Sequence, residues 1–133
     1  MNPHIDKSIR NAFQLLRIAE NELVRPQEDA VLFCSCQSTR NSASGFLKAY
    51  LLSHSYDKFQ NDSLSELLNQ CAKIDPHFKA IDLSCFDCRT EHADVCDEKY
   101  CLSLEKVNKC FERTNVIREL VMAKLKLSQK DFA

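Results

Sequence analysis

The sequence predicts an all-α fold, an up-and-down bundle of four to five antiparallel helices. The 133 residues include one glycine and three prolines, too few turn residues for a β-sandwich or a β-barrel. Apolar residues recur every three or four positions through most of the chain, as they do on one face of an α-helix. Short polar connections separate these stripes, which favours antiparallel neighbours.

We expect residues 1–133 to form a single domain with its core between about residues 5 and 125. Hydrophobic residues make up 44% and charged residues 28% of the chain, a balance typical of one globular core. The sequence contains no internal repeat and no linker long enough to separate two domains.

The first helix is predicted to begin at Asn2-Pro3, a capping residue followed by proline in the first helical position. Its apolar stripe then consists of Ile5, Ile9, Ala12, Phe13, Leu16, Ala19 and Leu23. The segment from Val24 to Glu28 interrupts this pattern, because Pro26 cannot continue a helix.

The second helix is predicted from about Ala30 to Leu52, with an unusual polar stretch in its middle. Gln37 to Ser42 contains no large apolar residue over almost two turns. Two interpretations remain open: either small side chains let another helix approach closely, or this face is open to a partner or ligand.

A third helix is predicted to begin after Ser63, because Ser63 and Glu66 form a capping-box pattern. Asp75-Pro76 then provides a stop and the start of a fourth segment, in which Phe78, Ile81, Cys85, Cys88 and His92 recur with helical spacing. A long last helix is indicated by the stripe of Tyr100, Leu104, Val107, Phe111, Thr114, Ile117, Val121 and Leu125.

Charge and composition exclude several classes of function. The net charge is −1, so no strong overall field draws the protein to nucleic acid or to a membrane. A single glycine is too few for the phosphate-binding loops of P-loop and dinucleotide-binding proteins. We see neither an export signal nor a long apolar segment, and therefore expect a cytoplasmic protein that does not enter a membrane.

Eight cysteines in a cytoplasmic protein are expected to be thiols rather than disulfides. Cys85, Cys88, His92 and Cys96 have a spacing that can build a zinc site. A continuous helix would separate Cys85 from His92 by roughly 10 Å along its axis, too far for all four residues to share one ion. We therefore predict no metal and no cofactor, and a zinc-stabilised structural domain is kept as an alternative.

Several segments together resemble the HEPN domain, the higher eukaryotes and prokaryotes nucleotide-binding domain. They are Phe46-Leu47-Lys48-Ala49-Tyr50-Leu51-Leu52, then Asn61 to Leu68 after a polar loop, and Asp75-Pro76-His77-Phe78. The likeness covers about residues 5–125. In the A-x-E-K-x-L-K-A pattern of that family, Ser44-Gly45 replaces the Glu-Lys pair, and Lys48 matches the lysine that follows it.

This resemblance implies a noncatalytic member of the family. Its nucleases place a histidine four to six residues after an arginine, whereas Arg89 and His92 are separated by only two residues. The implied function is a homodimeric module that binds a nucleotide, an RNA or a partner such as a nucleotidyltransferase. The alternative function is that of an enzyme, a HEPN ribonuclease with a degraded motif.

We assign no catalytic residue and expect a binding module rather than an enzyme. Arg40, Lys48 and Arg89 are the candidate ligand-binding residues, because guanidinium and ammonium groups are the usual phosphate partners in proteins. Ordinary surface charge is the alternative interpretation of these three residues.

Overall fold

The protein folds as an all-α helical bundle, which confirms the predicted class. The computed structural model describes residues 3–23, 32–56, 63–83 and 104–127. Within these ranges lie the helices α1 (Pro3–Leu23), α2 (Leu32–Ser53), α3 (Leu64–Ile74) and α5 (Leu104–Leu125), and the 3-10 helix η1 (Pro76–Ala80). The described residues contain no β-strand.

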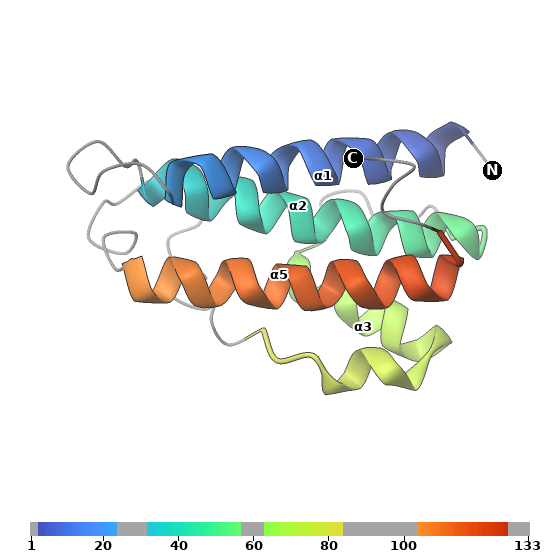
Figure 1. Cartoon of the computed structure of the whole chain (residues 1–133). Coiled ribbons are helices and arrows are strands. Elements are labelled where there is room, and N and C mark those ends of the chain that lie inside the picture. The colour runs from blue at the N-terminus through green and yellow to red at the C-terminus, as the bar shows by residue number, and fades with distance from the viewer. Residues whose placement is uncertain (1–2, 24–31, 57–62, 84–103, 128–133) are drawn as a thin grey trace.

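The three long helices lie side by side, and α2 contacts both α1 and α5 (Figure 1). Helix α1 is antiparallel to α2, so that Ser42 lies beside Ala12 and Gly45 beside Ser8. Helices α2 and α5 run in the same direction (Figure 1). The shorter elements α3 and η1 come between them in the chain, and α3 packs on α2.

The predicted stripe of α1 forms one wall of the core. Its members from Ile5 to Ala19 are all buried, and the ring of Phe13 meets that of Phe46 edge-on at 5.1 Å between centroids. Helix α1 ends at Leu23, before Pro26 as predicted. An amphipathic helix gains most of its stability from burying such a face.

The polar stretch of α2 allows close packing, which confirms the first of its two interpretations for the residues that face the core. Thr39 and Ser42 are fully buried. The Ser42 hydroxyl donates a 2.6 Å hydrogen bond to the carbonyl of Ala12, and the Ser8 hydroxyl donates a 2.8 Å bond to that of Gly45. Small side chains and these bonds thus hold α1 and α2 together.

The predicted end signals of α3 are both present. Ser63 and Glu66 form the reciprocal capping box, and Asp75 caps η1 with Pro76 at its start. Leu64, Leu67, Leu68 and Cys71 are buried, while Ile74 is 38% exposed. These local patterns therefore specified where one element ends and the next begins.

The fourth segment differs from the helical spacing that was predicted for it. It begins at Pro76, but it is a 3-10 helix that ends at Ala80, and Ile81 has extended backbone angles of φ −83° and ψ 123°. The ring of Phe78 packs against that of Tyr50 at a tilt of 50°, with centroids 4.7 Å apart, and both Phe78 and Ile81 are buried. Burial of Phe78 from the 3-10 helix and of Ile81 from extended backbone overrides the helical period.

The stripe of α5 is buried at Val107, Thr114, Ile117 and Val121. The Thr114 hydroxyl lies 2.9 Å from the carbonyl of Cys110 and 3.4 Å from that of Thr39, so this polar group is satisfied inside the core. Cys110 and Met122 are buried as well, although neither belongs to the predicted stripe.

Candidate functional site

Two of the three predicted ligand-binding residues lie on α2. Arg40 and Lys48 are both partly exposed. Eight residues of helix separate them by about 12 Å along the axis and by about 80° around it. Arg89 lies outside the described residues. A ligand that meets both Arg40 and Lys48 therefore needs two anionic groups or an extended shape.

The possible zinc ligands Cys85, Cys88, His92 and Cys96 also lie outside the described residues. Within the described part of the chain, no group of three or more histidine, cysteine, aspartate or glutamate side chains is arranged to hold a metal ion. Cys71 and Cys110 are buried and form no disulfide. Burial raises the pKa of Cys71 to about 12, which keeps this thiol protonated and unreactive.

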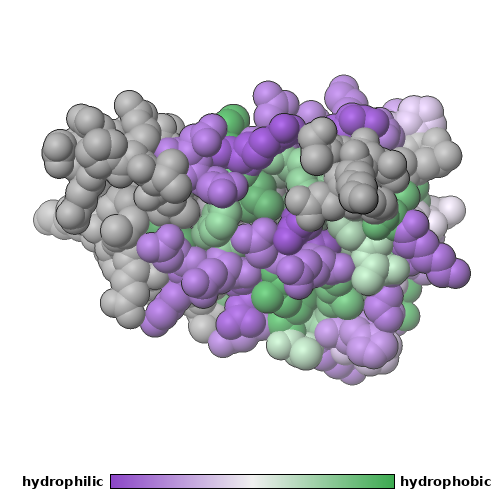
Figure 2. All heavy atoms as spheres, in the orientation of Figure 1, coloured by the Kyte–Doolittle hydropathy of each residue, from purple (hydrophilic) through white to green (hydrophobic). Residues whose placement is uncertain are grey.

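A groove that the sequence did not predict runs between α1 and α5. Its volume is about 440 Å³. Its apolar lining consists of Phe13 and Leu16 from α1 and Phe111 from α5. Figure 2 shows apolar surface between the hydrophilic side chains of these two helices.

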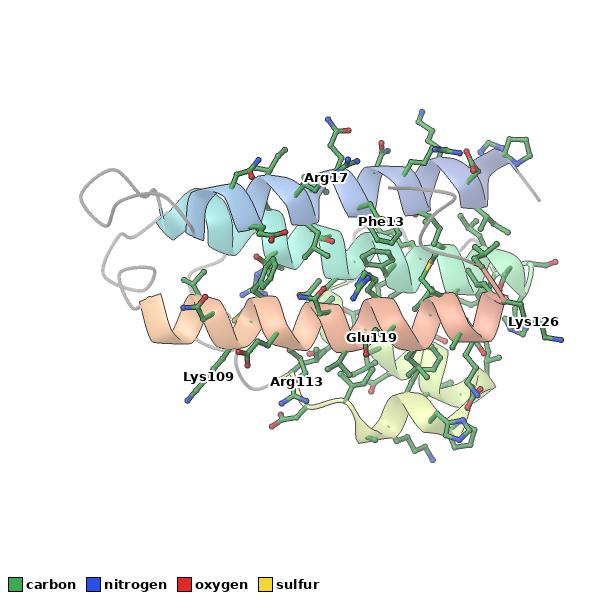
Figure 3. All side chains as sticks on the ribbon, in the orientation of Figure 1. Phe13, Arg17, Lys109, Arg113, Glu119 and Lys126 are labelled. Carbon is green, nitrogen blue, oxygen red and sulfur yellow. The ribbon has the colours of Figure 1, made fainter. Side chains whose placement is uncertain are left out.

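Each side of this groove carries one cation and one anion. Arg17 and Glu20 come from α1, and Arg118 and Glu119 come from α5. Figure 3 shows Arg17 and Glu119 on opposite sides of the same face. The Arg118 side chain is only 15% exposed, and its Nη2 lies 3.5 Å from Oε1 of Glu119, so its stem adds to the apolar lining.

Phe111 belonged to the predicted core stripe, yet it is only half-buried. Arg118 and Glu119, which flank that stripe, have the sequence pattern of ordinary surface residues. No local signal in the sequence brings residues 13–20 next to residues 111–119, so the groove was missed.

A second polar cluster joins η1 to the end of α5. Nζ of Lys124 donates to Oδ2 of Asp75 at 2.8 Å, and the backbone N–H of His77 donates to Oδ1 of Asp75 at 2.9 Å. Nδ1 of His77 lies 2.8 Å from both Oδ1 of Asp75 and Nζ of Lys124. Hydrogen bonds from Lys124 and His77 lower the pKa of Asp75 to about 2. Asp75 also caps η1, so this cluster has a structural role.

Tyr50 lies beside that cluster. Its ring packs between His54, at a centroid distance of 4.8 Å, and Phe78. Burial, and after it the charge of Asp75, raises the pKa of the Tyr50 hydroxyl. The hydroxyl is therefore neutral at physiological pH and is not a base.

We find no match to this chain among protein-family models, curated proteins or solved structures. No described helix combines the length and the apolar character that a membrane crossing requires.

Proposed function

We propose that the chain is a noncatalytic HEPN-like helical module. It binds a nucleotide, an RNA or a protein partner such as a nucleotidyltransferase, and it acts as a homodimer in the cytoplasm. Arg40, Lys48 and Arg89 contact the anionic groups of the ligand in this proposal.

The observation that carries the proposal is the agreement between the resembling segments and the helix boundaries. Phe46 to Leu52 lies in the C-terminal half of α2, Ser63 caps α3, and Asp75-Pro76 begins η1. The partial exposure of Lys48 on α2 supports a role at the surface of the bundle.

The test is a titration of the full-length reduced protein with fluorescently labelled ATP, GTP and a short single-stranded RNA. Saturable binding of one of these ligands is expected. The double variant Arg40→Ala/Arg89→Ala should weaken it at least tenfold, because each lost charge-assisted hydrogen bond contributes about 1.5–3 kcal/mol. The matched control Lys109→Ala on the exposed side of α5 should leave affinity within about twofold.

The outcomes separate the proposal from its alternatives. Unchanged affinity in the double variant refutes the assignment of the ligand-binding residues, and no binding at millimolar ligand refutes the nucleotide and RNA forms of the proposal. RNA cleavage that survives chelator indicates a HEPN ribonuclease. A native mass spectrum with one zinc ion per chain indicates the zinc-stabilised domain instead.

A further inference from the structure

Among the described residues, no helix covers the long face of the bundle that contains the groove between α1 and α5 (Figure 1). Of the apolar lining of the groove, Phe13 and Leu16 are buried, with 5% and 6% of their surface exposed, and Phe111 is half-buried. A groove between two helices that has apolar side chains in its lining is a common binding site for a further helix. The pattern of charge on the walls indicates which surface that is.

The walls of the groove are balanced in charge. Arg17 stands one turn from Glu20 on α1, and Arg118 adjoins Glu119 on α5. A polyanion would meet two carboxylates here as well as two guanidinium groups, so the balance disfavours nucleic acid. A surface that also carries two guanidinium groups and two carboxylates could instead place a group of opposite charge against each of them.

We propose that this groove is the interface between two copies of the chain. The two-fold axis lies along the groove, which sets α1 of each copy against α5 of the other. Arg17 then meets Glu119 of the partner subunit, and the same pair forms a second time by symmetry. Phe111, the half-buried apolar residue of the groove, lies in this interface in each copy.

The size of the face agrees with a dimer. Helices α1 and α5 have 21 and 22 residues, hence lengths of about 32 Å at 1.5 Å per residue. Two adjacent helices, each about 10 Å wide, present roughly 600 Å² in projection, and side-chain relief brings this close to the ~800 Å² per partner of a standard interface. Both partners of the proposed ion pair lie at the surface, since Arg17 is exposed and the Glu119 side chain is 72% exposed.

This inference rests on the homodimer of the proposed function and adds the surface that forms it. Sedimentation equilibrium of the full chain, reduced and at 1–100 μM, is expected to show a monomer–dimer equilibrium. Arg17→Glu and Glu119→Arg should each raise the dimer dissociation constant about tenfold or more, because each substitution replaces two attractive pairs by two repulsive ones. The combination Arg17→Glu/Glu119→Arg should restore the constant to within about threefold of the native value.

The control is Lys7→Glu, which makes the same change of charge at an exposed position of α1 outside the groove lining. It should leave the dimer unchanged, and circular dichroism should show native helix content in all four variants. A native chain that remains monomeric at 100 μM overturns the inference. The inference is also overturned if neither single reversal changes the dimer dissociation constant, or if the double reversal fails to restore it.

Ligand titrations of the same samples report separately on the proposed function. A dimer that responds to the charge reversals but binds no ligand supports the interface and refutes ligand binding. A dimer that binds ligand and ignores the reversals refutes only the assigned surface.

Discussion

The contact between Gly45 and Ala12 should make two substitutions strongly dependent on each other. A Cβ atom added at Gly45 would lie 3.0 Å from Cβ of Ala12, whereas its distances to the carbonyl oxygen of Ser8 and to Cα of Ala12 are 3.5 and 3.6 Å. Carbon atoms pack best at about 3.5–4.0 Å. The single close approach is therefore to the Ala12 methyl group.

The magnitude follows from two opposing terms. Gly45→Ala gains about 1 kcal/mol of helix propensity, but overpacking costs about 1–3 kcal/mol. Any separation of the helices also stretches the hydrogen bonds from Ser42 to Ala12 and from Ser8 to Gly45. Gly45→Ala should therefore destabilise the native protein by up to about 2 kcal/mol.

The same substitution should stabilise the Ala12→Gly variant by about 1 kcal/mol, because the opposing methyl group is gone and only the propensity gain remains. Urea unfolding of the four proteins in this cycle measures the coupling, expected at about 1–3 kcal/mol. As a control, Ala12→Gly should be additive with Glu112→Ala on the exposed side of α5, to within about 0.5 kcal/mol. A coupling between Gly45→Ala and Ala12→Gly that is also below about 0.5 kcal/mol would refute the close approach of the two helices.

Three further predictions concern single elements. Lys126 adopts a left-handed conformation with φ 58° after α5, so Lys126→Gly should stabilise the protein by about 1 kcal/mol in urea unfolding, and a loss of stability would contradict this cap. Ser63→Ala should cost about 1 kcal/mol in the same assay, because it removes the hydroxyl that accepts from the backbone N–H of Glu66; an unchanged midpoint would argue against the capping box. The pKa of Asp75 falls from 3.8 to about 2 on folding, so its carboxylate stabilises the fold above about pH 4 and this contribution disappears as the pH falls towards 2. The Asp75→Asn variant should accordingly have a lower melting temperature than the native protein at pH 7 and nearly the same melting temperature near pH 2. A difference in melting temperature that does not depend on pH would count against the cluster.

Local patterns in the sequence were sufficient for most helix boundaries. Ser63 with Glu66, and Asp75 with Pro76, act through the backbone groups of their own helix ends. The stripe from Ile5 to Ala19 predicted the buried face of α1, because helical spacing places these residues on one side whatever they pack against. The ligand-binding residues belong to the proposed function, since they depend on a partner and not on the chain alone.

The fourth segment shows where helical spacing was insufficient. Phe78 and Ile81 have the spacing of a helix, yet the chain leaves the 3-10 helix at Ala80 and is extended at Ile81. Both side chains are buried by this route. Burial depends on the position of α2 and its Tyr50 ring, which a spacing pattern within one segment does not contain.

The sequence by itself determined the helical class, the buried face of α1 and the local caps, because these depend on residues within a few positions of one another. Only the tertiary structure decided what those faces meet. Gly45 against Ala12, Thr114 beside Thr39, and the groove between α1 and α5 each join residues 33 or more positions apart. Such contacts depend on how the side chains of two helices interlock, and that is specified by packing of the whole bundle rather than by the pattern of either helix.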